Sequence, residues 1–150
     1  MRVALLQYPI AWADKEANLR LAEERIAALA GKADVAVLPE MFATGFCTDH
    51  PELAETMDGD IIRRLQAAAN QSGVAIVSSF ICKPAIGQRL VNRGFMITPN
   101  PTSSPLKEEL EGVQIQDKRH LYAHGGEDQF FQPAQERHIF EYKGVKILLL

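Results

Sequence analysis

Two carboxylates and one amine occupy positions where strands end or turns begin. Glu40 directly follows the apolar run and proline at 35–39, and Lys118 follows a second run with strand character at 113–117. Glu127 follows a pair of glycines, which allow the backbone to turn sharply. In α/β proteins, ligands bind beyond the carboxyl ends of the strands. This placement makes Glu40, Lys118 and Glu127 candidates for one shared site.

The three side chains have complementary chemistry. A carboxylate beside Met41, Phe42 and Phe46 is expected to be partly desolvated, which raises its pKa and suits it to act as a general base. A lysine in a pocket stabilises the negative oxygen of a tetrahedral intermediate, and a second carboxylate would keep its ammonium charged and oriented. Taken alone, each position also fits a solvated loop, so the chemistry depends on the three residues meeting.

The cysteines and histidines do not form a recognisable site. Cys47 and Cys82 lie far apart without a CxxC pair or a secretory signal, which predicts ordinary buried thiols rather than a disulfide or a zinc site. His120 and His124 are four residues apart and would share one face of a helix, but no third ligand or HExxH pattern accompanies them. The sequence therefore predicts no metal centre.

The elements that would position the candidate residues alternate between strands and helices. Apolar runs at 2–8 and 34–38 flank a helix whose N-cap is predicted at Asp14 and whose left-handed C-terminal cap is predicted at Gly31. A helical crossover returns the chain in the same direction, so the two strands should be parallel. A second helix, with an apolar stripe, is expected to end at Gly73.

Further strands are predicted after the second helix, at 74–77, 90–98, 113–117, 138–142 and 145–150. Residues 99–112 are rich in Pro, Ser and Glu and are expected to form a solvated connection. The sequence ends within an apolar run, which needs neighbours on both sides, so more polypeptide is expected downstream. The alternation indicates an α/β fold.

Composition narrows the class of protein. The chain has 150 residues, 23% of them charged, a formal net charge of -3 and a pI of about 5.8. This length fits one domain or a large part of one, and the absence of a basic excess argues against a nucleic-acid partner. Neither a signal peptide nor an apolar run long enough to span a membrane is present, which predicts a soluble cytoplasmic protein.

Several motifs together resemble one family. With LPEMF at 38–42 and DKRHL at 117–121 both in place, the sequence resembles the nitrilase, or carbon–nitrogen hydrolase, superfamily. The motifs QYP at 7–9, TGF at 44–46 and VNR at 91–93 look like the branch that contains ω-amidases. The resemblance covers essentially the whole chain.

This resemblance implies a fold and a site. The fold would be a four-layer αββα sandwich, with residues 1–150 forming the N-terminal part of a single domain that is cut within the strand preceding the nucleophile. Glu40 would be the general base of a Glu-Lys-Cys triad, Lys118 the oxyanion stabiliser and Glu127 the second carboxylate that positions the lysine. The nucleophilic cysteine would follow just after Leu150, and neither cysteine of this chain matches its position.

The implied activity is hydrolysis of a non-peptide carbon–nitrogen bond in a small amide, as in ω-amidases, with ammonia released through a cysteine thioester. No cofactor is required, and family members commonly form homodimers. Nitrile and N-carbamoyl hydrolysis use the same triad and stay open, as does an inactive fragment that acts only through a partner. A nucleotide-binding domain lacks its glycine motifs here. Two departures from the family, an insertion at 101–111 and Ala134 in place of glycine, put local loop geometry in doubt.

Overall fold

The computed structural model describes residues 1–85, 87–100 and 112–149. The insertion expected at 101–111 lies outside the described residues. The described residues form seven strands: β1 (Val3–Leu5), β2 (Val35–Val37), β3 (Ala75–Cys82), β4 (Val91–Ile97), β5 (Val113–Asp117), β6 (Ile139–Tyr142) and β7 (Val145–Leu148). Its helices are α1 (Lys15–Ala27), α2 (Asp60–Ser72), the short α3 (Glu127–Phe130), and the 3₁₀ turns η1 (Pro51–Leu53) and η2 (Ala123–Gly125).

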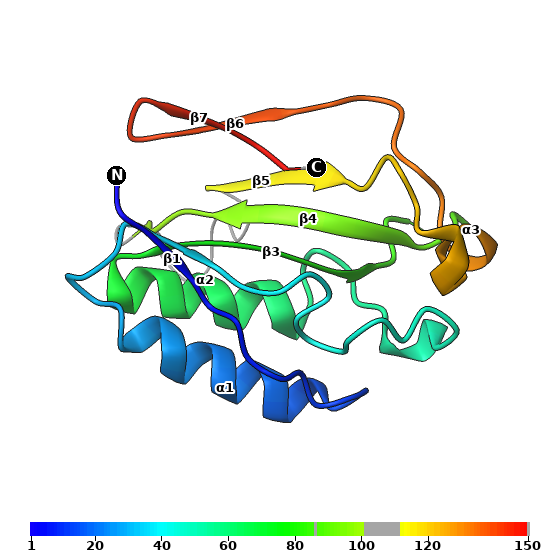
Figure 1. The fold of residues 1–150 in the computed structure, drawn as a ribbon, viewed down its shortest axis with the longest axis horizontal. Helices are drawn as coiled ribbons and strands as arrows, with labels where there is room; N and C mark the ends of the chain where they lie inside the picture. The colour runs from blue at the N-terminus through cyan, green and yellow to red at the C-terminus, as the bar shows by residue number, and fades with distance from the viewer. Residues whose placement is uncertain (86, 101–111, 150) are drawn as a thin grey trace.

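The sheet keeps the order of the sequence, β1-β2-β3-β4-β5. The first three strands are parallel because α1 and α2 carry the crossovers, whereas β4 and β5 return as antiparallel neighbours. Figure 1 shows α1 and α2 on one face of this sheet and the β6-β7 hairpin on the other. The α/β prediction is confirmed, and the layers are helices, sheet and a second, smaller sheet.

Alternation along the strands separates two parts of the core. Ile76 and Phe95 face α1 and α2, while Val77 and Met96 face the hairpin, where Phe140 is also buried. All residues of β3 and β4 are buried, as expected for central strands covered on both sides. The strand predicted at 74–77 runs on to Cys82, because serines at 78 and 79 interrupt the apolar pattern but not the strand.

Two of the three predicted helix ends are confirmed. The Asp14 carboxylate accepts a hydrogen bond from the Ala17 N–H at 3.0 Å, and Gly73 closes α2 in the left-handed conformation with φ 69°. The prediction of a C-cap at Gly31 is wrong. The helix ends earlier, in a right-handed turn at Ala28, and Gly31 uses its positive φ in the loop that leads to β2. Neither α1 nor α2, with 13 residues each, nor any other described helix could span a bilayer.

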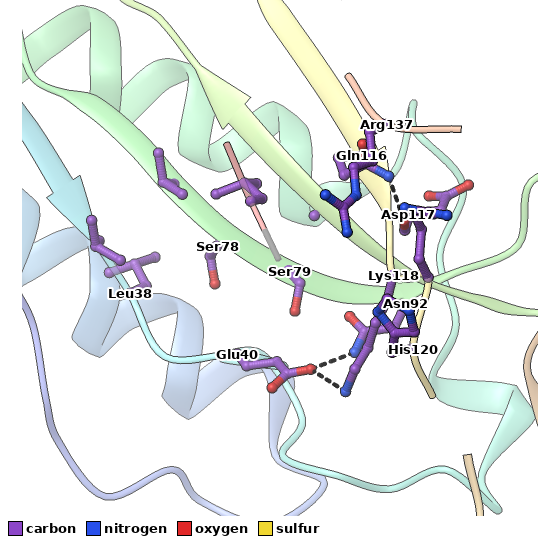
Figure 2. Close-up of a pocket in the computed structure, with 15 residues that line it drawn as sticks. Leu38, Glu40, Ser78, Ser79, Asn92, Gln116, Asp117, Lys118, His120 and Arg137 are labelled. Carbon is purple, nitrogen blue, oxygen red and sulfur yellow. Dashed lines mark hydrogen bonds and ion pairs between the residues drawn. The ribbon is translucent and has the colours of Figure 1, made fainter. Parts of the chain in front are cut away.

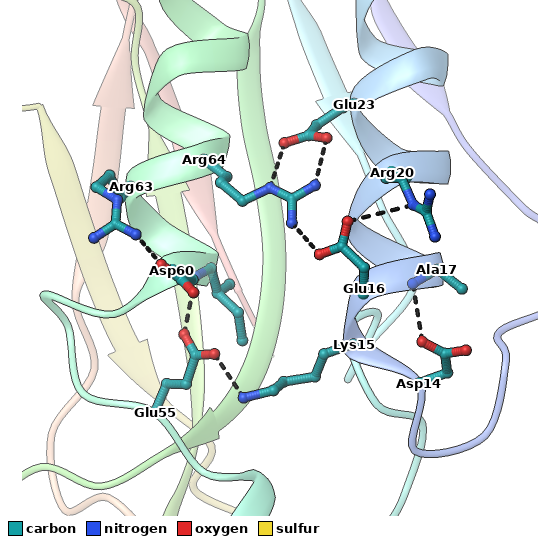
Figure 3. Close-up of polar contacts among 11 residues, drawn as sticks. Asp14, Lys15, Glu16, Ala17, Arg20, Glu23, Glu55, Asp60, Arg63 and Arg64 are labelled. Carbon is teal, nitrogen blue, oxygen red and sulfur yellow. Dashed lines mark hydrogen bonds and ion pairs between the residues drawn. The ribbon is translucent and has the colours of Figure 1, made fainter.

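An arginine joins the two helices across their solvent-facing side. Arg64 on α2 forms a two-pronged pair with Glu23 on α1, with both N–O distances at 2.7 Å, and also contacts Glu16 at 2.6 Å (Figure 3). The Arg64 side chain is only 26% exposed. A planar guanidinium paired with one carboxylate through two bonds is more favourable than a single exposed contact.

Replacing Arg64 with methionine should lower the free energy of unfolding of the full-length protein by about 1 kcal/mol, because the contact between α1 and α2 loses its paired charges while the apolar stem stays. Urea denaturation measures the change. The neighbouring Arg63→Met is the matched control, since Arg63 pairs with Asp60 on its own helix and both side chains are exposed. Equal losses in the two variants would contradict a role in joining the helices.

Candidate active site

Side chains from β3 hold the backbone on both sides of Glu40. The Ser78 hydroxyl donates to the Pro39 carbonyl at 2.7 Å, and the Met41 N–H donates to the Ser79 hydroxyl at 3.0 Å. Met41 has a φ of 52°, an uncommon conformation for a residue with a side chain. The two serines therefore fix a sharp turn, and Glu40 leaves that turn toward the cavity (Figure 2).

Glu40 is partly covered, as expected from its apolar neighbours, but two of those neighbours point elsewhere. The Glu40 side chain is 44% exposed. Met41 and Phe42 are fully buried because the turn directs them into the core, away from the carboxylate. Phe46 instead lies near Lys118, with the ammonium nitrogen 5.7 Å from the ring centroid.

Lys118 follows β5 and connects the two carboxylates. Its backbone N–H donates to the Asn92 carbonyl of β4 at 2.9 Å, which continues the strand pairing and fixes where the side chain starts. Its ammonium donates to Glu40 Oε1 at 2.9 Å and to Glu127 Oε2 at 2.8 Å. The lysine side chain is 18% exposed. The structure thus brings together the three residues singled out in the sequence, from positions up to 87 residues apart (127 minus 40).

Glu127 is the buried member of the group. It begins α3 directly after Gly126, whose φ of 75° makes the turn that places it there, and its side chain is 0% exposed. Besides the lysine, the carboxylate accepts hydrogen bonds from the Tyr122 N–H and from Asn92 Nδ2, the latter at 3.1 Å. A buried carboxylate with this many donors is held in one orientation.

The charges of the pair stabilise each other. Burial by itself would raise the pKa of Glu127, but the hydrogen bonds from Lys118, Tyr122 and Asn92 outweigh it and the pKa is lowered. Burial would lower the pKa of Lys118, but its hydrogen bonds to Glu127 and Glu40 and their charges leave that pKa raised. The stabilising contribution of Glu127 is lost as pH falls through its lowered pKa, and that of Lys118 is lost as pH rises through its raised pKa. Between these limits the ion pairs are intact.

Glu40 and Lys118 border a cavity of about 220 Å³ at the ends of β2 and β5, and the buried Glu127 supports Lys118 from outside its lining. Leu149, just after β7, lines the same cavity, together with Arg119 and Arg137. Gly94 makes room for Leu149, because a Cβ at position 94 would lie 3.1 Å from its Cδ1 atom. The chain therefore reaches the cavity at Leu149, directly after the hairpin.

The two cysteines lie outside the cavity, and the two histidines lie apart from each other. Cys47 and Cys82 are fully buried and do not line the cavity, and burial raises the pKa of both thiols, that of Cys82 to about 11. His120 lines the cavity, but His124 lies in η2 and stacks on Tyr122, so the two histidines do not share a helix face. Within the described ranges, no group of three or more His, Cys, Asp or Glu side chains could hold a metal ion.

The sequence did not identify Asn92 and Ser79 as part of the site. Both are polar residues inside fully buried strands, and Asn92 also stands in the VNR motif at 91–93, but neither observation assigned a role to them. The doubt about Ala134 is resolved locally: its N–H donates to the Lys118 carbonyl at 3.0 Å, and its φ is not positive, so glycine is not required there.

Comparisons with a family model and with curated proteins point to one family. The family model for carbon-nitrogen hydrolase matches residues 2–147. The chain is 32% identical over its full length to omega-amidase YafV of Escherichia coli K12, covering 53% of that protein. It is 29% identical to an (R)-stereoselective amidase of a Pseudomonas species, covering 50% of it. The chain therefore spans about half the length of these curated relatives.

Solved structures agree with the fold. XC1258 from Xanthomonas campestris, a CN-hydrolase superfamily protein with an arsenic adduct in its active site, aligns with a TM-score of 0.84 and 30% identity over 98% of this chain and 51% of its own. An amidase from Nesterenkonia aligns with a TM-score of 0.80 and 22% identity over 100% of this chain and 54% of its own, which supports the fold alone. The match of the family model over nearly every residue shows that the chain belongs to the carbon–nitrogen hydrolase family.

Proposed function

We propose that the whole protein hydrolyses the carbon–nitrogen bond of a small amide, with Glu40 as general base, Lys118 as oxyanion stabiliser and Glu127 as the carboxylate that positions the lysine. One observation carries this proposal: the Lys118 ammonium lies between two carboxylates, 2.9 Å and 2.8 Å away, at the edge of a cavity. A cation fixed in this way can stabilise a developing oxyanion without rearranging.

The nucleophile in this proposal is a cysteine supplied by the residues that follow Leu150. Leu149 supports this because it lines the same cavity as Glu40 and Lys118. The next few residues would therefore enter the cavity beside the base. In this proposal, residues 1–150 are the N-terminal part of a single hydrolase domain.

The reaction proceeds through a thioester. Glu40 takes the thiol proton, the thiolate attacks the amide carbon, and the carbonyl electron pair moves to oxygen, where Lys118 and a backbone N–H stabilise it. The tetrahedral intermediate then expels the amine nitrogen, which takes the proton from Glu40 and leaves as ammonia. Water, deprotonated by Glu40, attacks the thioester, and the acid product and the free thiol are released.

The proposed substrate is the amide of a short 2-oxo dicarboxylate, such as 2-oxoglutaramate. The similarity to an omega-amidase supports this choice. The cavity also has two guanidinium side chains in its lining, Arg119 and Arg137. A guanidinium pairs with a carboxylate through two parallel hydrogen bonds, so either arginine suits a substrate that carries one.

The test is ammonia release from 2-oxoglutaramate by the full-length protein. We expect turnover by the parent protein, and none when the first cysteine after Leu150 is replaced with alanine or when residues 1–150 are assayed alone, because the nucleophile is then absent. Nitriles and N-carbamoyl amino acids are assayed in parallel and would redefine the substrate if they react instead. Ammonia release by residues 1–150 alone would show that the nucleophile assignment is wrong.

A further inference from the structure

One uncharged residue contacts all three charged residues of the site. Asn92 lies on β4 and is 1% exposed. Its side-chain nitrogen donates to Glu40 Oε1 at 2.7 Å and to Glu127 Oε1 at 3.1 Å. Its backbone carbonyl accepts a hydrogen bond from the backbone N–H of Lys118 at 2.9 Å. Figure 2 shows its amide beside the Lys118 ammonium, with both facing Glu40.

We propose that Asn92 is a positioning residue that keeps the two carboxylates apart and directs one oxygen of Glu40 toward the proton it removes. This inference rests on the proposed function, because it concerns how Glu40 serves as the base. Asn92 acts through the two glutamates and does not itself touch the reacting atoms.

The chemistry of a primary amide fits this role. An ionised carboxylate only accepts hydrogen bonds, so the NH₂ end of Asn92 must face Glu40 and Glu127, and its two N–H groups match the two carboxylates. Lys118 supplies one positive charge to two negative ones. A neutral donor adds support for both carboxylates without changing that balance, whereas aspartate at position 92 would add a third negative charge.

The bonds also select one oxygen of Glu40. Oε1 accepts from both Lys118 and Asn92. Oε2 accepts no hydrogen bond from the part of the chain that the structure describes, so it is the oxygen left for a proton. A base whose other oxygen is held by two donors cannot rotate freely, and the basic atom keeps a fixed place in the cavity.

A second buried asparagine shows what a purely structural role looks like. Asn18 is also 1% exposed, but both of its ends are satisfied by backbone: it donates to the Ala11 and Ala43 carbonyls and accepts from the Ala11 N–H. The Asn92 oxygen, by contrast, is buried and has no hydrogen-bond partner among the described residues. Its placement therefore serves the carboxylates rather than its own hydrogen bonding.

The titratable groups around the two glutamates are few. Lys118 faces both of them, and Tyr122 contributes only its backbone N–H. Other charged or titratable side chains border the cavity: Asp117, which pairs with Arg93 at 2.7 Å, Arg119, His120 and Arg137. None of them forms a hydrogen bond or ion pair with Glu40 or Glu127 within the described residues, so Lys118 and Asn92 are the side chains whose hydrogen bonds hold Glu40 there.

The test replaces Asn92 in the full-length protein and follows amide hydrolysis against pH. For Asn92→Asp, kcat should fall about 100-fold with KM changed less than about threefold, because a positioned donor is lost and ground-state binding is not. The acidic limb of kcat/KM should move up by about one pH unit, since an added negative charge makes Glu40 easier to protonate. Asn92→Ser, which keeps one donor, should be intermediate in both measurements and serves if the aspartate variant does not fold.

Asn18→Asp is the matched control. It introduces the same change at an equally buried asparagine, so it should lower the melting temperature but leave the acidic limb in place. A parental kcat and an unmoved limb in folded Asn92→Asp or Asn92→Ser would overturn the inference. Glu40→Gln in the same assay separates this outcome from failure of the proposed function. Full activity in Glu40→Gln would show that Glu40 is not the base. Loss of activity in Glu40→Gln, with normal Asn92 variants, would contradict only the role of Asn92.

Discussion

Replacing Lys118 with alanine in the full-length protein should lower kcat for a small amide by a factor on the order of 10³, because the transition-state oxyanion loses its fixed cation. The loss should appear mainly in kcat, since the ammonium is engaged by Glu40 and Glu127 before substrate arrives. Steady-state ammonia release measures it. The variant should also be less stable, because Glu127 is then buried without its counter-ion.

Lys143→Ala is the matched control for this change. Lys143 forms a 2.7 Å ion pair with Asp34, but the pair lies on the surface, with 50% of the lysine side chain exposed. Its removal should leave kcat unchanged. A folded Lys118→Ala protein with near-normal turnover would take Lys118 out of the mechanism, whatever its stability.

Glu40→Gln should lower kcat/KM by about 10²- to 10⁴-fold, the range expected when a general base is lost. Glutamine keeps the size of the side chain and an oxygen for the Lys118 bond, so the geometry survives while the basicity does not. Because Glu40 is 44% exposed, its replacement should change the melting temperature little. Thermal unfolding beside the kinetic assay separates a chemical effect from misfolding.

Glu52→Gln provides the comparison for an ordinary carboxylate. Glu52 lies in η1, is 65% exposed and contacts His50. It should retain parental kcat/KM across the pH range. If Glu40→Gln is as active as Glu52→Gln, another group takes the proton and the assignment of Glu40 as base is wrong.

The arrangement of strands and helices was predictable because it follows from the spacing of apolar residues along short segments of the sequence. The apolar spacing along α1 and α2 and the β-branched runs gave the parallel β1-β2-β3 unit, and the positions of Glu40 and Lys118 after strands placed both at one edge of the sheet. Gly31 was misassigned because a glycine after a helix predicts a left-handed residue but not the turn in which it is used.

The support around the site was not predictable in the same way. Asn92 meets Glu40 from 52 positions away, and Ser79 meets Met41 from 38 away, contacts that arise only when strands pair. The directions taken by the neighbours of Glu40 were not predictable for a related reason. Its neighbours in sequence are apolar, but the positive φ at Met41 sends them into the core. Residues that are neighbours in the sequence of a loop need not point their side chains in the same direction.

The two serine contacts to the turn around Glu40 have an evolutionary consequence. Since β3 anchors the turn at Pro39 and Met41, the location of the proposed base is inherited from the sheet and not from the loop that follows it. Residues after position 44 can then diverge in length and shape between relatives without displacing that carboxylate.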